Sequence, residues 1–274
     1  MLLNYFYVTI MALIVGSFLN LLIYRLPIML QNIWQHECAK LLSLPSQAEA
    51  RINLFLPRSF CPQCKTTIKA FDNIPILSFI LLNGRCGQCG NLISLRYPVV
   101  EGLSCILALL AAWHFGFNVT FVFALLFIWI TIALFFIDLE QQLLPDSLTL
   151  GLLWLGLIAN AQSLFIPLPI AVFSASGAYL FLWLFIKLFD LVTGKIGMGN
   201  GDFKLFAAFG AWFGWLALPL ILICASIGGV LVGSIYLKIQ GKTKDTPIPF
   251  GPFLCVAGVL SLFWGRGIIN WYLD

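Results

Sequence analysis

The stretch Gly197-Met-Gly-Asn-Gly-Asp-Phe-Lys204 lies directly before an uncharged run at residues 205–237. Its three glycines allow a tight turn and the close approach of another chain. A carboxylate that enters a membrane helix is costly, so Asp202 is a candidate functional residue. The uncharged run has 33 residues, which is long for one membrane span and short for two spans of about 20 residues each.

The composition is that of a protein embedded in a lipid bilayer. Of the 274 residues, 61% are hydrophobic and only 9% are charged, whereas a soluble domain has about 25% charged residues. The first apolar segment lacks a basic leader and a small-residue cleavage motif, so we expect a retained helix rather than a signal peptide. The basic residues form no stripe interleaved with aromatic residues, and we expect no nucleic-acid partner.

The uncharged runs predict the membrane helices. Two of them, at 102–137 and 147–186, are each long enough for two spans and are each interrupted by turn-forming residues. Single spans are predicted at 2–24 and near 252–271. If 205–237 forms two short spans, the total is eight.

The positions of the basic residues favour eight spans over seven. With eight, 14 of the 15 Lys and Arg residues fall on one side of the membrane, and only Arg266 does not. The positive-inside rule makes that side the cytoplasm. With seven, Lys238, Lys242 and Lys244 would lie outside. The sequence therefore predicts an all-α polytopic membrane protein with about eight transmembrane helices and both termini outside the cytosol.

The change in composition along the chain predicts three parts. Arg25 and Pro27 are expected to end the first helix, which gives a transmembrane helix at 1–24. Residues 25–96 are richer in charge and are predicted to form a small cytoplasmic domain between helices 1 and 2. Residues 97–274 are predicted to form the membrane domain with helices 2–8.

Two aspartates stand out at the cytoplasmic boundary. Asp138 closes an apolar run at an expected helix C-terminus, where a negative charge is unfavourable, so helix capping does not explain it. Asp202 lies at the start of the helix expected in the run that begins at residue 205. The alternative to a catalytic role for Asp202 is that of a helix N-cap. Two close carboxylates from separate helices share one proton. The ionised one then activates a water and the protonated one polarises a carbonyl, which is aspartyl protease chemistry.

Neighbouring residues are predicted to support this pair. Gly199 and Gly201 would let an extended substrate backbone come close. Pro145-Asp146-Ser147 is typical of a helix start, so Asp146 is predicted to be structural and is the second choice for the catalytic pair. Lys204, a cation in the first turn of a helix, is expected to reach lipid phosphate rather than to act in catalysis.

Four cysteines have the spacing of a metal site. They form the two pairs Cys61-Pro-Gln-Cys64 and Cys86-Gly-Gln-Cys89. Two such pairs predict a structural zinc site with four thiolate ligands and no position for water. The alternative is two redox-active or idle thiol pairs, and a reducing cytoplasm argues against stable disulfides.

The sequence resembles the type IV prepilin peptidases, which are Gly-x-Gly-Asp intramembrane aspartyl proteases. The resemblance rests on five motifs in chain order, which together cover nearly the whole sequence: Gly16-Ser-Phe-Leu-Asn-Leu-Leu-Ile-Tyr-Arg-Leu-Pro27, Arg96-Tyr-Pro-Val-Val-Glu101, Ile137-Asp138 with Leu144-Pro-Asp-Ser-Leu-Thr149, Gly199-Asn-Gly-Asp-Phe-Lys204, and Pro249-Phe-Gly-Pro252. The family's catalytic aspartates map to Asp138 and Asp202.

The resemblance implies a bacterial inner-membrane endopeptidase with its active site at the cytoplasmic face. Its substrates would be prepilins and pilin-like secretion subunits, which carry a short basic leader before an apolar helix. Family members with the tetracysteine domain also methylate the new N-terminal amine with S-adenosylmethionine, so we expect this second activity here. The sequence shows no glycine-rich fingerprint for the methyl donor.

Two other functions remain open at this point. Intramembrane carboxylates also serve proton- or cation-coupled transporters, although the sequence shows no inverted repeat. A non-catalytic assembly factor for pili or secretion would use the zinc module to dock cytosolic partners, and substitutions of its aspartates would be silent.

Overall fold

The computed structural model describes residues 1–43, 53–61, 63–68, 71, 74–194, 198–240 and 248–273. Gly197 of the glycine-rich stretch, and the basic residues Lys242 and Lys244 that helped to set the predicted topology, lie outside the described residues.

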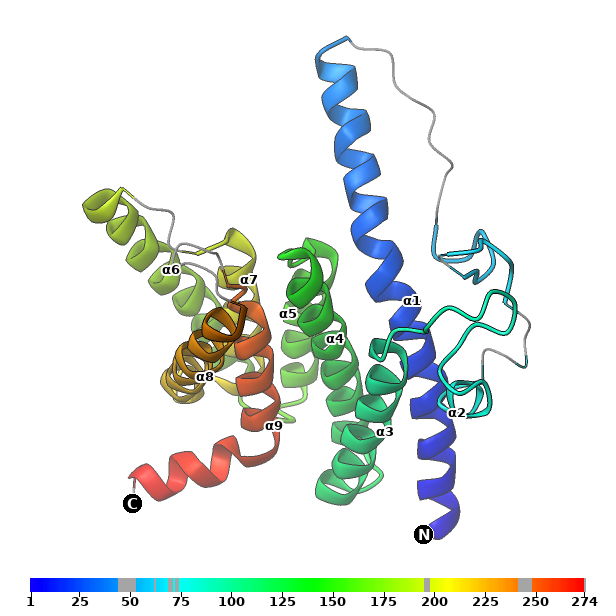
Figure 1. The fold of residues 1–274 in the computed structure, drawn as a ribbon. Coiled ribbons are helices and arrows are strands. Elements are labelled where there is room, and N and C mark those ends of the chain that lie inside the picture. Colours follow the sequence, from blue (N-terminus) through cyan, green and yellow to red (C-terminus); the bar gives the residue numbers. More distant parts are fainter. Residues whose placement is uncertain are drawn as a thin grey trace. The chain divides into compact units, whose positions relative to one another are not determined.

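Helices make up nearly all of the regular structure in the described residues (Figure 1). In chain order they are α1 (Leu2–Leu41), α2 (Leu77–Leu81), α3 (Arg96–Phe115), α4 (Val119–Gln141), α5 (Asp146–Ala161), α6 (Leu168–Thr193), α7 (Asn200–Phe213), α8 (Ala217–Gln240) and α9 (Gly251–Leu273). The β-structure seen there consists of two isolated bridges beside the cysteine pairs. The expected all-α fold is therefore confirmed.

Six of these helices, α1, α3, α4, α6, α8 and α9, are long and apolar enough to cross a membrane. The helices α5 and α7 are shorter, with 16 and 14 residues. At 1.5 Å per residue, α7 is about 21 Å long, less than the roughly 30 Å hydrocarbon core. The run at 205–237 does contain two helices, because the chain breaks at Gly214, whose φ is +79°.

The first helix is longer than predicted. Instead of ending at Arg25 and Pro27, α1 continues to Leu41, and both residues are buried within it. Proline inside a helix removes one hydrogen bond and commonly breaks the helix. Here the guanidinium of Arg25 donates to the carbonyls of Asn53 and Pro57, at 2.8 and 2.6 Å. Tertiary packing at this level of α1 thus outweighs the local preference for a break.

The chain divides into two compact units, Met1–Ala112 and Trp113–Asp274. In the first unit α1 and α3 pack closely. A Cβ on Gly16 would lie 2.8 Å from the Cα of Glu101, so only glycine fits there. The Ser104 hydroxyl donates to the Ala12 carbonyl at 2.8 Å. The sequence predicted that the cytoplasmic domain ends at residue 96 and that the membrane domain begins at residue 97. That division stays a prediction, and α3 packs on α1 of the first unit.

Glu101 and Arg25 connect the cysteine-containing segment to these two helices. The buried carboxylate of Glu101 accepts a hydrogen bond from the backbone N–H of Ile76, at 2.7 Å, directly before α2. Arg25 binds the loop that precedes the first cysteine pair. Two buried charged side chains therefore anchor the segment, one from α1 and one from α3.

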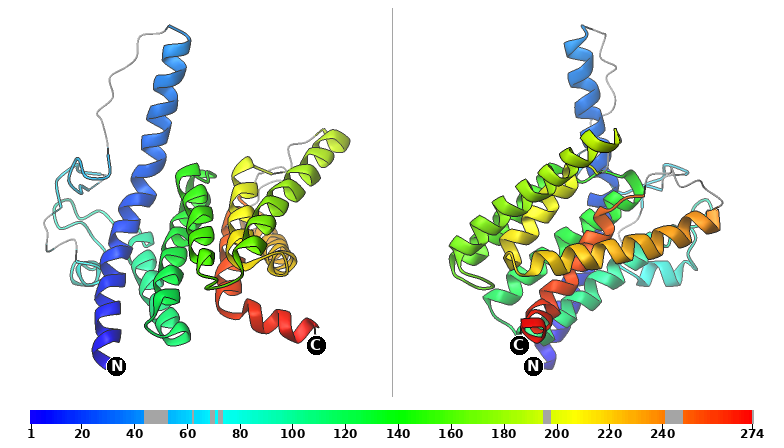
Figure 2. Two further views of the ribbon diagram at one scale, coloured as in Figure 1. Left: turned by 180° about the vertical axis from the view of Figure 1, so that it is seen from behind. Right: turned by 90° about the vertical axis from the view of Figure 1, so that its left-hand side faces the viewer.

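In the second unit α7 is the central helix and packs against α5, α6, α8 and α9 (Figure 2). The indole N–H of Trp212 donates to the Leu152 carbonyl at 2.8 Å, and the missing side chain of Gly156 leaves room for its ring. The side-chain amide of Asn160 donates to the Ala211 carbonyl at 2.7 Å. These contacts lock the C-terminal half of α7 onto α5.

Candidate functional site

Asp138 lies in the last turn of α4, and its side chain is only 6% exposed. The C-terminus of its own helix does not favour a negative charge. The first residue of α9, Gly251, directs its backbone N–H at the carboxylate in a hydrogen bond. The positive end of the α9 dipole therefore offsets the unfavourable position of Asp138 on α4.

Asp202 lies in the first turn of α7 and is 8% exposed. The N-cap position belongs to Gly199, so the N-cap interpretation of Asp202 is wrong. A backbone hydrogen bond from Gly199 reaches the Asp202 carboxylate, as in a capping box, and this accounts for one oxygen. The other oxygen, Oδ1, is buried and has no hydrogen-bond partner among the residues that the structure describes.

The structure brings the two aspartates together. Asp138 acts electrostatically on Asp202, and both carboxylates act on the buried thiol of Cys255 in α9. All three side chains belong to the second unit and come from α4, α7 and α9. A pair of buried acids from separate helices, one with an unused oxygen, is able to hold a water and a peptide carbonyl.

Leu144 fills the space between the helix ends that carry the site. A Cβ on Gly201 would lie 2.7 Å from the Cβ of Leu144, and a Cβ on Gly251 would lie 2.5 Å from Oδ2 of Asp138. Both glycines are therefore required by close packing. Gly199 has more room, since its Cβ would lie 3.5 Å from Oδ2 of Asp202. The substrate-accommodating role expected for Gly199 and Gly201 stays a prediction.

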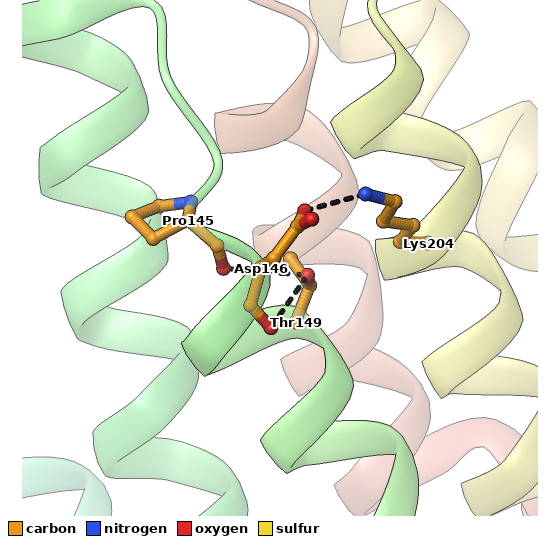
Figure 3. A network of polar contacts seen from close by, with 4 residues as sticks. All are labelled: Pro145, Asp146, Thr149 and Lys204. Carbon is orange, nitrogen blue, oxygen red and sulfur yellow. Dashed lines mark hydrogen bonds and ion pairs between the residues drawn. The ribbon is translucent and has the colours of Figure 1, made fainter. Parts of the chain in front are cut away.

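Asp146 and Lys204 form an ion pair between α5 and α7 (Figure 3). Lys204 Nζ lies 2.6 Å from Asp146 Oδ1. Asp146 begins α5, as the sequence predicted, although its side chain makes no cap hydrogen bond. Lys204 was expected to reach lipid phosphate, and in the structure its ammonium group instead contacts this carboxylate.

The four paired cysteines converge on one point in the first unit. Their sulfur atoms all lie within 4.8 Å of one another, and the Sγ atoms of Cys61 and Cys89 are 3.9 Å apart. A tetrahedral zinc with Zn–S bonds of about 2.3 Å places its sulfurs roughly 3.8 Å apart. The donor set and its geometry therefore fit a structural zinc site.

Both cysteine pairs have the same local fold. In each, the backbone carbonyl of the first cysteine accepts a hydrogen bond from the backbone N–H four residues later. Lys65 donates to Cys61 and Gly90 donates to Cys86, each at 2.9 Å. Both donors have positive φ, 60° and 70°. Glycine suits this conformation at position 90, whereas Lys65 adopts it at the equivalent position of the first pair.

The thiols also have the electrostatics of a metal site. Side-chain and backbone hydrogen bonds from Thr66 lower the pKa of the Cys64 thiol to about 6. A backbone hydrogen bond with Asn91 lowers the pKa of the Cys89 thiol. Burial and the neighbouring thiols disfavour another negative charge, and together they raise this pKa to about 11. Four sulfurs this close ionise together only around a cation.

Comparisons with known proteins show similarity along most of the chain. The profile of the bacterial peptidase A24 N-terminal domain matches residues 10–115, and that of the type IV leader peptidase family matches residues 125–234. A protein of Legionella pneumophila named prepilin leader peptidase/N-methyltransferase is 59% identical over 98% of this chain and 94% of its own length. This chain belongs to the type IV leader peptidase family.

Further members of the type IV leader peptidase family align over most of the chain. Proteins of the same name from Stutzerimonas stutzeri and Pseudomonas aeruginosa are 49% and 47% identical, each over 97% of this chain and 92% of its own length. No solved structure matches the chain significantly. Asp138 and Asp202 fall in the region matched by the leader peptidase family, and the cysteines fall in the N-terminal match.

Sequence reasoning missed the residues that hold this leader peptidase together. Gly251 stood inside a quoted motif, but nothing in the sequence connected it to Asp138. Arg25 was interpreted as a helix end and Glu101 as part of a motif without a role. The available signal was charge: both are ionisable residues beside long apolar runs, where burial requires a partner.

Proposed function

We propose that this chain is a membrane aspartyl endopeptidase that removes the basic leader from type IV prepilins and then methylates the new N-terminal residue. The observation that carries the proposal is the pair of buried carboxylates, Asp138 and Asp202, which come from α4 and α7 and interact electrostatically. Membership of the type IV leader peptidase family, and relatives named prepilin leader peptidase/N-methyltransferase, support the same activity.

In the proposed mechanism the two aspartates share one proton and act as a unit. The ionised carboxylate takes a proton from water as the water oxygen attacks the scissile carbonyl carbon. The protonated carboxyl donates a hydrogen bond, and then its proton, to the carbonyl oxygen. Return of a proton to the leaving nitrogen breaks the C–N bond. The hydrogen bond from Gly251 holds Asp138 in place, and Oδ1 of Asp202 is free to contact the substrate.

The proposed substrates fit the depth of this pair. A prepilin, or a pilin-like secretion subunit, has an apolar helix that lies in the bilayer and a basic leader that stays outside it. Its cleavage site is then at the membrane boundary. Asp138 ends α4 and Asp202 begins α7, so both lie at helix ends rather than at midspan. The bias of the basic residues supports the cytoplasmic face of the bacterial inner membrane.

Zinc is proposed as a structural ion held by Cys61, Cys64, Cys86 and Cys89. When bound, the ion would neutralise thiolates and close the two turns into one small module. With all four positions taken by sulfur, it leaves no site for a catalytic water. Arg25 and Glu101 would then hold a rigid module against α1 and α3 rather than a loose loop.

The second activity requires S-adenosylmethionine as a co-substrate. In the proposed transfer the methyl carbon leaves the sulfonium sulfur and bonds to the new N-terminal amine, which loses a proton. The residues of this step stay unassigned. Incubation of cleaved pilin with radiolabelled methyl donor tests the activity, and cleaved pilin that stays unlabelled refutes it.

Leader cleavage of a purified prepilin in detergent tests the peptidase. We expect cleavage by the wild type and none by Asp202→Asn or Asp138→Asn, since the amide keeps the size of the side chain but cannot act as acid or base. Glu140→Gln is the matched control, because it neutralises an exposed acid two residues from Asp138. It should cleave at the wild-type rate.

The outcomes separate the possible roles of each acid. Full activity of a folded Asp202→Asn protein would leave Asp202 as a structural residue of the α7 terminus. Full activity of Asp138→Asn together with loss in Asp146→Asn would replace Asp138 by Asp146 in the pair. A folded wild type that cleaves no prepilin would refute the proposed function.

A further inference from the structure

An ion pair joins the first turns of α5 and α7. Asp146 is the first residue of α5 and Lys204 the fifth of α7, and their charged atoms are 2.6 Å apart. Figure 3 shows the two side chains pointing toward each other across the space between the helices. The Thr149 hydroxyl donates to the Pro145 carbonyl at 3.3 Å and so steadies the turn that carries Asp146.

Lys204 holds α7 from a face other than the one that carries Asp202. Residues two apart on a helix do not face the same way. The side chains of Lys204 and Asp146 are 26% and 61% exposed, whereas Asp202 is 8% exposed. The ion pair therefore lies at the rim, and the carboxylate of Asp202 lies inside.

The two ends of α7 are fixed in different ways. The hydrogen bonds from Trp212 and Asn160 hold its C-terminal end, about 15 Å from Asp202 at 1.5 Å per residue. At the N-terminal end, Gly201 packs on Leu144, and the ring of Phe203 meets that of Tyr179. Apolar contacts allow small rotations there, and the ion pair adds a contact with a defined direction.

We propose that Asp146 and Lys204 form a positioning pair that sets where the Asp202 carboxylate stands relative to Asp138. The inference rests on the proposed function and deepens it. Neither residue touches the reacting atoms. Without the pair, the first turn of α7 would tilt about its contact with Leu144, and the two carboxylates would lose their alignment. This role also accounts for a third acid at the site that the chemistry does not use.

A double-mutant cycle tests the pair. The proteins are wild type, Asp146→Asn, Lys204→Met and the double variant, each assayed for prepilin cleavage with kcat and KM measured separately. A misplacement of 1 Å costs about 100-fold in rate, and a smaller tilt should lower kcat about 10-fold in each single variant. Because both substitutions break one contact, the double variant should also lose about 10-fold, not about 100-fold.

Conservative variants supply the control. Lys204→Arg and Asp146→Glu keep opposite charges within reach and should recover most of the wild-type kcat. All variants should keep the wild-type KM, bound zinc and melting temperature within a few degrees, because a partly exposed ion pair adds little to stability.

Other outcomes overturn the proposal. A loss in the double variant equal to the product of the single losses shows that the residues act separately. A raised KM with unchanged kcat in Lys204→Met shows that the lysine binds the substrate. Complete loss in a folded Asp146→Asn, unrelieved by Asp146→Glu, makes Asp146 a catalytic acid. An inactive wild type refutes the proposed function, whereas an active wild type with independent losses refutes the positioning pair alone.

Discussion

Replacing Gly251 by alanine tests how closely α9 packs on Asp138. The new Cβ would lie 2.5 Å from Oδ2 of Asp138, whereas ordinary contact begins near 3.4 Å. The carboxylate or the start of α9 must therefore move by roughly 0.9 Å. A misplacement of about 1 Å costs about 100-fold in rate, which corresponds to about 2.7 kcal/mol of activation free energy. We expect Gly251→Ala to lower kcat about 100-fold.

Two other glycines of α9 provide controls. A Cβ on Gly267 meets nothing within 4 Å, so Gly267→Ala should keep full activity. A Cβ on Gly258 would lie 2.6 Å from the Phe209 ring, an overlap of the same size with an apolar partner. Gly258→Ala should therefore lower the melting temperature more than it lowers kcat.

The assay is single-turnover cleavage of a purified prepilin in detergent, with melting temperature and zinc content recorded for each variant. Gly251→Ala should be folded, bind zinc and cleave slowly. Cleavage within twofold of wild type by a folded Gly251→Ala protein would refute the argument that this glycine positions Asp138. Equal losses of kcat in Gly251→Ala and Gly258→Ala would mean that general packing strain is responsible.

Three further predictions concern stability and metal binding. Cys61→Ser should reduce zinc from about one ion per chain to less than half and lower the melting temperature, since metal binding and folding are coupled; undiminished zinc by elemental analysis would contradict the site. Gly156→Ala should lower the free energy of unfolding by about 1–3 kcal/mol in denaturant titration, because its Cβ would lie 2.5 Å from the Trp212 ring. Gly151→Ala is the control: its Cβ would meet nothing within 4 Å, so the substitution should be neutral or stabilising. Arg25→Lys keeps the charge but loses the two-pronged contact, and it should release zinc to a chelator faster than wild type; an unchanged release rate would show that this anchor does not hold the module.

Local patterns were sufficient for much of the fold. Helix-length uncharged runs predicted α4, α6 and α9. The run at 205–237, predicted to form two short spans, contains two helices divided at Gly214, of which α8 is long enough to cross a membrane. Asp138 and Asp202 were found because a carboxylate next to an apolar run has few ordinary explanations. The cysteine spacing predicted a cluster that the sulfur positions confirm.

The remainder depended on contacts between distant residues. Lys204 and Asp146 are 58 positions apart, and no spacing rule connects them. The preference of Pro27 to end a helix was real but local, and the packing around Arg25 outweighed it. The need for glycine at position 251 depends on a carboxylate of another helix. Sequence reasoning therefore singled out the two aspartates and the four cysteines, and the structure was needed to show which residues hold them in place.

The matching hairpins around the two cysteine pairs make the halves of the metal site equivalent. Each is an eight-residue segment closed by an antiparallel bridge, Phe60 with Thr67 and Arg85 with Leu92. Such a repeat has the form of an internal duplication. A chain in which the second segment is copied into the place of the first should still gather four sulfurs around one ion. Residues that differ between the two segments can then make different contacts with their surroundings. For example, the ammonium group of Lys65 lies over the ring of Phe60, whereas the other hairpin has Gly90 at the equivalent position.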